Sequence, residues 1–142
     1  MLETVEGDSE AGMRVRCRKI VSGSGEGEAL VTTQPINFLT MIDLKSGVVK
    51  DEKHELHGQN ITDKVLVFPN AIGSSVSAYS VYALKINNVA PRAMVCNKAD
   101  MTTASGCAIA NIPLVDQPDT DIYAIKSGTK VKLDENLIEV AF

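Results

Sequence analysis

The sequence predicts a single α/β domain with many short strands and two or three helices. Its 142 residues suit one domain, and a chain of this size buries roughly two thirds of its unfolded surface. Apolar residues make up 44% of the chain and charged residues 23%, which is ordinary globular usage and excludes disorder throughout. Short β-branched runs alternate with longer segments that lack Gly and Pro, as expected when strands alternate with helices.

The charges divide the chain at residue 13. The formal net charge is -4, and the four excess acids, Glu3, Glu6, Asp8 and Glu10, all lie in residues 1–12. We therefore expect a flexible acidic tail over 1–12 and the folded domain over 13–142. A neutral domain lacks the basic surplus of nucleic-acid proteins, so no nucleic-acid partner is predicted. No apolar run approaches the ~20 residues that cross a bilayer, and the acidic N-terminus is unlike a signal peptide, which predicts a cytoplasmic protein without a membrane partner.

The first half of the domain contains mostly strands. Arg14, Arg16 and Arg18 alternate with apolar residues, which predicts a strand with one basic face. Residues 22–27 carry three alternate glycines and are predicted as a hairpin turn. A dinucleotide-binding loop would need a helix next, whereas residues 28–33 are typical of a strand. Further on we expect a short strand at 47–49, a charged solvated loop at 50–57 and a buried strand at 64–68.

The second half adds the helices. Residues 76–86 run without Gly or Pro and carry several apolar side chains, which predicts a helix buried on most sides and ended by Asn87 and Asn88. The remaining predicted elements are a strand at 93–96, a helix at 103–110, a strand at 114–115, a helical turn at 119–126 and a hairpin formed by 129–133 and 137–140.

Cys17, Cys96 and Cys107 are too few and too scattered for a disulfide framework. They form no CxxC pair, and a cluster of iron and sulfur usually needs three or four thiolates. We expect three buried structural thiols and no metal bound by this chain.

Residues 64–79, KVLVFPNAIGSSVSAY, have the clearest chemical interpretation. They predict a buried strand, a tight turn, two serines and then a helix. Backbone N–H groups at a helix N-terminus bind anions, and ligands of α/β sheets gather at the carboxyl ends of strands. Gly73 permits close approach to the backbone. The pattern alone favours an N-cap role for Ser74 or Ser75, which contributes about 1 kcal/mol, and leaves a functional role open.

An ordered set of segments resembles the small subunit of the aconitase X family. It extends over about residues 19–140 and consists of the following segments: Gly27 to Val31; Pro35-Ile36-Asn37-Phe38; Asp43 with Ser46 to Val49; His54, Leu56 and Gly58; Lys64 to Val67 through Gly73-Ser74-Ser75; Ala90-Pro91; and Ile112 to Val115.

The resemblance implies a single swivelling β/β/α domain, like the mobile domain of aconitases. It also implies a partner, a large aconitase-like subunit that carries a 4Fe–4S cluster. The implied reaction is the dehydration of a small phosphorylated hydroxy acid, (R)-5-phosphomevalonate, to trans-anhydromevalonate 5-phosphate in the archaeal mevalonate route to isoprenoids. Iron would act as a Lewis acid on the leaving hydroxyl.

The resemblance also assigns roles to residues. Family members have a Gly-Ser pair that corresponds to Gly73-Ser74, so Ser74 is implied as the proton acceptor, with Ser75 as the substitute. Gly73, Ser75 and Asn70 are the implied substrate-binding residues.

Two features depart from the family pattern. The family's basic residue before the Gly-Ser pair is Ile72 here, so a cation would have to come from Arg14, Arg16 or the large subunit. The family's His-Pro-Leu becomes His54-Glu55-Leu56, and His54 is either a solvated side chain or a substrate ligand.

Two alternatives stay open at this stage. One is the small subunit of a cis-3-hydroxyproline dehydratase. The other is a non-catalytic binding or regulatory module in which Ser74 only caps a helix.

Overall fold

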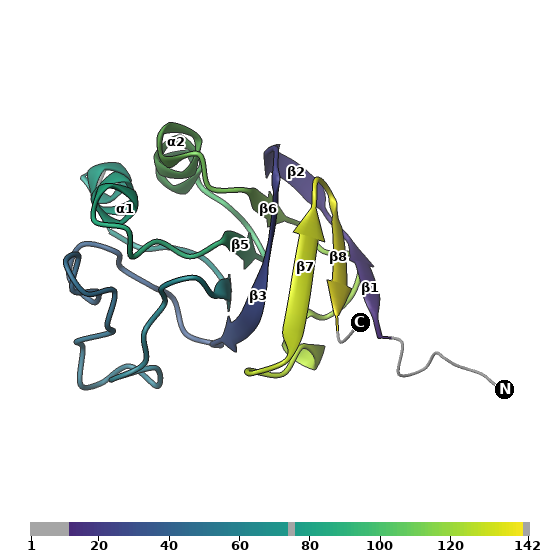
Figure 1. The fold of residues 1–142 in the computed structure, drawn as a ribbon, viewed down its shortest axis with the longest axis horizontal. Helices are drawn as coiled ribbons and strands as arrows, with labels where there is room; N and C mark the ends of the chain where they lie inside the picture. Colours follow the sequence, from purple (N-terminus) through teal and green to yellow (C-terminus); the bar gives the residue numbers. More distant parts are fainter. Residues whose placement is uncertain (1–11, 74–75, 141–142) are drawn as a thin grey trace, which may run out of the picture.

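The computed structural model describes residues 12–73 and 76–140 (Figure 1). The predicted acidic tail, apart from Gly12, lies outside these residues. The described chain forms eight strands and two α-helices in three layers, which confirms the predicted α/β fold. No helix among the described residues is both long enough and apolar enough to span a bilayer.

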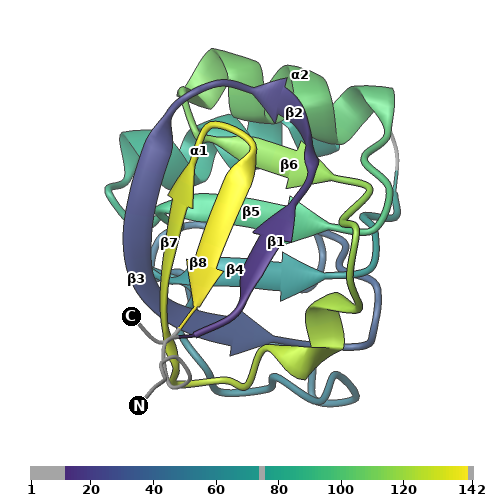
Figure 2. The ribbon, with the colours of Figure 1, turned by 90° about the vertical axis from the view of Figure 1, so that its right-hand side faces the viewer.

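The strands form one strongly bent sheet. Its order is β1-β8-β7-β3-β4-β5-β6-β2, with parallel pairing from β3 to β6 and antiparallel pairing elsewhere. β1 and β2 are separated by one residue in the chain yet stand at opposite ends of this order, so the sheet nearly closes on itself. Figure 2 shows β7, β8 and β1 in front of the parallel strands. The bounds are β1 Arg14–Arg16, β2 Arg18–Val21, β3 Ser24–Val31, β4 Val65–Phe68, β5 Ala93–Cys96, β6 Leu114–Asp116, β7 Lys130–Asp134 and β8 Leu137–Val140.

The parallel strands are buried on both faces. All four residues of β4 and all four of β5 are buried, as expected for a strand covered on both sides. Val65 and Val67 point into a core between the two parts of the sheet. Leu66 and Phe68 point into a second core under the helices. Alternation along one strand therefore produces the β/β/α layers that the family resemblance implied.

The two helices cover one face of the parallel strands. α1 spans Ser77–Ile86 and α2 spans Met101–Ala110, and both were predicted. They pack closely at Gly106, where an added Cβ would lie 3.1 Å from Val81 Cβ. The prediction that α1 is buried on most sides was wrong, since Tyr79 is 74% exposed and Ile86 is 60% exposed. As an outer-layer helix, α1 contacts the sheet and α2 only along its inner face.

The C-terminal elements match their prediction. β7 and β8 form the terminal hairpin, and a short 3₁₀ helix, η1 (Ile122–Ala124), occupies the predicted helical turn. The side chain of Asp121 accepts a hydrogen bond from the backbone N–H of Tyr123 and begins that turn. Residues 48 and 49 make only isolated bridges, to Asn60 and Ile42, instead of the predicted strand.

The glycine-rich segment is not the predicted hairpin turn. Most of residues 22–27 belongs to β3, which pairs with β7 and β4 and not with β2. A Cβ at Gly25 would lie 2.5 Å from the carbonyl O of Arg92, and a Cβ at Gly27 equally close to the carbonyl O of Asp63. These glycines let β3 run against two connecting segments of backbone.

Candidate active site

The carboxyl ends of β4, β5 and β6 meet at one edge of the sheet, where the three arrowheads point in Figure 2. Two of the segments that leave this edge are residues 69–73 after β4 and residues 97–100 after β5. Ligands of parallel sheets commonly bind at such an edge. The predicted site residues belong to the first of these segments.

The turn after β4 is held by the loop that follows β3. Ile36 and Ala71 form a parallel bridge. The N–H of Ile36 donates to the carbonyl O of Asn70 at 3.2 Å, and the N–H of Ile72 donates to the carbonyl O of Ile36 at 2.9 Å. Gly73 then adopts φ +121°, a conformation that L residues rarely adopt. The backbone conformation at position 73 thus requires the glycine of the Gly-Ser pair.

Ser74 and Ser75 lie outside the described residues. The elements on either side are the ones predicted: the buried strand β4 precedes them and α1 begins shortly after, at Ser77. The roles of Ser74 and Ser75, and those of Gly73 and Asn70 in substrate binding, stay predictions.

A hollow of about 390 Å³ lies beside this turn, lined by residues 69–71 and 97–100. We call it the edge hollow. Its lining includes both Asn70 and Lys98, a cation that the sequence pattern does not single out. Arg14 and Arg16, the predicted sources of a cation, belong to β1, and neither lines the edge hollow. Arg14 instead lies 3.3 Å from Glu139 on β8.

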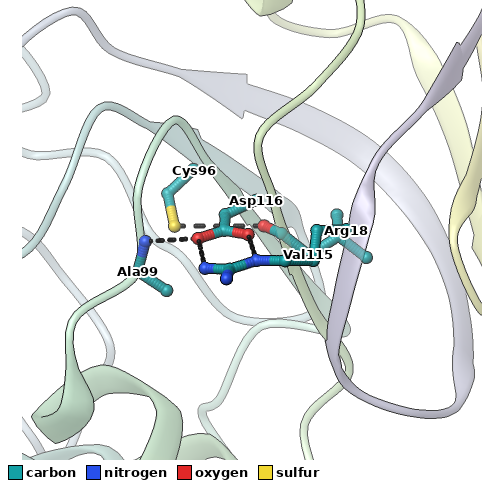
Figure 3. Close-up of polar contacts among 5 residues, drawn as sticks. All are labelled: Arg18, Cys96, Ala99, Val115 and Asp116. Atoms are coloured by element: carbon teal, nitrogen blue, oxygen red, sulfur yellow. Dashed lines mark hydrogen bonds and ion pairs between the residues drawn. The ribbon is translucent and has the colours of Figure 1, made fainter.

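A buried carboxylate, Asp116, is hydrogen-bonded to Ala99, one of the residues that line the edge hollow (Figure 3). Asp116 ends β6 with no exposed surface. Its Oδ1 accepts from Arg18 Nε and its Oδ2 from Arg18 Nη2, both at 2.8 Å. The backbone N–H of Ala99 also donates to Oδ2 at 2.8 Å. Burial by itself would raise the pKa of Asp116, but the hydrogen bonds from Arg18 and Ala99 outweigh it and lower the pKa below its ordinary value.

The sequence pattern does not predict a role for this carboxylate. Arg18 stood out only as one of three alternating arginines, and Asp116 was not singled out. The sequence does contain a signal for it. Asp116 directly follows the apolar pair Leu114-Val115, so it stands where a buried strand is predicted to end.

His54 is buried, which corrects the prediction that it belongs to a solvated loop. Its side chain is only 6% exposed. Nδ1 accepts a hydrogen bond from the N–H of Leu56 at 3.1 Å, and Nε2 lies 3.2 Å from the carbonyl O of Pro35. His54 therefore supports the start of the 35–38 loop from inside. The rest of the charged segment, His57 included, is largely exposed as predicted.

The cysteines are free thiols. Cys96 and Cys107 are fully buried, as predicted, whereas Cys17 is partly exposed. Burial raises the pKa of Cys107 to about 12. Burial, together with the negative charges of Asp119 and Asp116, also raises the pKa of the Cys17 thiol to about 12. Within residues 12–73 and 76–140, no group of three or more His, Cys, Asp or Glu side chains is placed to hold a metal ion.

Comparison with known proteins agrees with this geometry. The family model of the aconitase X swivel domain matches residues 14–140. The phosphomevalonate dehydratase small subunit of Thermococcus kodakarensis is 42% identical over 128 residues, which cover 90% of this chain and 95% of that protein. The protein of the same name from Methanococcoides burtonii is 44% identical, over 86% of this chain and 90% of that one.

A solved structure shares the fold. The crystal structure of Thermococcus kodakaraensis aconitase X in its holo-form superimposes with a TM-score of 0.87 at 40% identity, over 91% of this chain and 98% of that chain. The resemblance seen in the sequence is thereby confirmed across the β/β/α domain. This chain belongs to the aconitase X swivel domain family.

Proposed function

We propose that this chain is the small subunit of an archaeal phosphomevalonate dehydratase. The observation that carries the proposal is the near full-length match to relatives with that name, at 42% and 44% identity. The position of Gly73 supports it, because the turn that contains Gly73 leaves the edge of the sheet where ligands of parallel sheets commonly bind. We place the complex in the cytoplasm, where free thiols such as those of this chain are usual.

The proposed reaction removes water from (R)-5-phosphomevalonate. The hydroxyl leaves C3 and a proton leaves C2, beside the carboxylate, which forms the double bond of trans-anhydromevalonate 5-phosphate. A 4Fe–4S cluster on a large aconitase-like subunit would supply the Lewis acid for the leaving hydroxyl. The described residues of this chain offer no metal-binding group, so we assign the cluster to the partner and derive no step through it.

This chain would supply the proton acceptor and part of the anion site. We assign the C2 proton to Ser74, and substrate binding to Gly73, Ser75 and Asn70. Asn70 lies in the wall of the edge hollow with Lys98. A substrate with a phosphate and a carboxylate needs such local positive charge, because the body of the chain is neutral.

Reconstitution tests this proposal. The chain alone should be inactive with (R)-5-phosphomevalonate, and activity should appear with a cluster-bearing large subunit. Ser74→Ala in that complex should lower kcat by about 10³-fold, the range expected for loss of a general base. Ser75→Ala is the matched control, and we expect it to lower kcat by less than about tenfold.

Two outcomes would contradict the assignment. Full turnover by the Ser74→Ala complex would remove Ser74 from catalysis. A complex that dehydrates cis-3-hydroxyproline and not phosphomevalonate would assign the sister specificity.

A further inference from the structure

Asn37 presents a fixed amide group to the backbone of Gly73. The bridge between Ile36 and Ala71 brings the two segments together. An L side chain at position 73 would place its Cβ 3.0 Å from Asn37 Nδ2 and 2.9 Å from Ser77 Oγ. Two polar atoms therefore converge on the face of Gly73 that has no side chain.

The orientation of this amide is set by the loop itself. Asn37 Oδ1 accepts hydrogen bonds from the backbone N–H of Leu39 at 3.0 Å and of Thr40 at 3.1 Å. Both backbone groups of Asn37 are hydrogen-bonded to Met41. The N–H of Asn37 donates to Met41 Sδ, and the carbonyl O of Asn37 accepts from the N–H of Met41. Because the amide oxygen is engaged on one side, the NH₂ group faces the other way, toward Gly73.

Neither of these two atoms has a hydrogen-bond partner among the residues that the structure describes. Asn37 Nδ2 makes no hydrogen bond to any described residue, although every other polar group of Asn37 does. Ser77 is only 4% exposed, yet its buried Oγ has no hydrogen-bond partner among the described residues. A buried polar atom without a hydrogen-bond partner is rare and energetically costly. Because Ser77 Oγ lies beside a second unpaired donor, Asn37 Nδ2, the two atoms together indicate a binding site for a hydrogen-bond acceptor.

We propose that Asn37 binds the carboxylate of the substrate, with the Ser77 hydroxyl as a second donor. This inference rests on the proposed function for the identity of the substrate. Gly73 directly precedes the proposed proton acceptor, and the carbon that loses its proton is the neighbour of the carboxylate. Negative charge grows on the carboxylate oxygens as that proton leaves, and a neutral amide held in place stabilises the growing charge.

This role predicts an effect on kcat more than on KM, because the interaction strengthens in the transition state. Asn37→Asp tests it in the complex with the large subunit. The new side chain keeps an oxygen for Leu39 and Thr40 but replaces the two N–H donors with a charged acceptor. We expect kcat to fall at least 100-fold, KM to rise only about tenfold and the melting temperature to stay within a few degrees.

Ser77→Ala should lower kcat about tenfold. Asn88→Asp is the control, because it makes the same change of charge at an exposed residue beyond the opposite end of α1. It should behave like the wild-type complex.

A binding measurement separates this inference from the proposed function. The probe is 3-hydroxy-3-methylbutyrate, which carries the carboxylate and the tertiary hydroxyl without the phosphate, titrated calorimetrically into the complex. We expect Asn37→Asp to weaken its binding at least tenfold and Asn88→Asp to leave it unchanged. If this difference appears in a complex that does not dehydrate phosphomevalonate, the proposed function fails and the carboxylate site stands.

Three results would overturn the inference. The wild-type complex could fail to bind the probe, or Asn37→Asp could bind it as tightly as the wild type. The third result is a rise in KM alone that disappears when mevalonate replaces phosphomevalonate, which would place the phosphate at Asn37.

Discussion

Arg18 and Asp116 face each other across the antiparallel pair of β2 and β6 and are joined by two hydrogen bonds of 2.8 Å. Asp116 has no exposed side-chain surface, whereas the Arg18 side chain is 52% exposed. The carboxylate also accepts from the N–H of Ala99, a residue that lines the edge hollow. The pair therefore links the closure of the bent sheet to the loop after β5.

Loss of Arg18 should destabilise the domain. Arg18→Ala leaves a buried carboxylate with Ala99 as its remaining donor, and removing one partner of a buried ion pair costs about 3 kcal/mol. Urea unfolding measures this loss of free energy. Lys19→Ala is the control, because its bridge to Glu135 is 46% exposed on both sides and should contribute about 0.5 kcal/mol. Equal effects of the two substitutions would contradict the importance of the buried pair.

Acid should weaken the fold through the same carboxylate. The pKa of Asp116 is lower in the folded protein than its ordinary value, which is about 3.9 in an unfolded chain. The folded state therefore binds this proton less readily. The contribution of Asp116 is complete above about pH 5 and is lost as the pH falls through the folded pKa, with a slope of at most about 1.4 kcal/mol per pH unit.

The measurement is the urea midpoint between pH 7 and pH 3, for the wild type and for Asp116→Asn. Glu55 and Glu135 also have lowered pKa values, so the wild-type slope contains their contributions as well. The difference between the two proteins isolates Asp116. We expect a shallower loss of stability in Asp116→Asn, and parallel curves would exclude this carboxylate as a source of acid sensitivity.

Gly25 should be intolerant of even one added carbon. The Cβ of Gly25→Ala would lie 2.5 Å from the carbonyl O of Arg92, so backbone has to move, and we expect the free energy of unfolding to fall by about 2 kcal/mol. Glu26→Ala on the same strand changes an exposed side chain and should stay within about 0.5 kcal/mol. Thermal and urea unfolding compare the two variants. A Gly25→Ala protein as stable as Glu26→Ala would show that β3 can move away from the Arg92 segment at no cost.

The elements that the sequence predicts best are those defined by local pattern. The β-branched run of β4, the strand β5 and the terminal hairpin were predicted because burial on both faces, or alternation with a tight turn, leaves a signature in consecutive residues. The errors came from residues whose role depends on distant backbone. The glycine pattern predicts a turn at Gly25 and Gly27, but their neighbours in space are Arg92 and Asp63, more than 30 positions away in the chain.

The sequence by itself determined the layered α/β class, the family and the position of the Gly-Ser pair between a buried strand and a helix, because these depend on short-range pattern and motif order. Only the tertiary structure decided which side chains lie against Gly73. Asn37 reaches Gly73 through the bridge at Ile36, and Arg18 reaches Asp116 because the bent sheet brings β2 beside β6. Contacts of this kind join residues tens of positions apart, and periodicity along a chain carries no information about them.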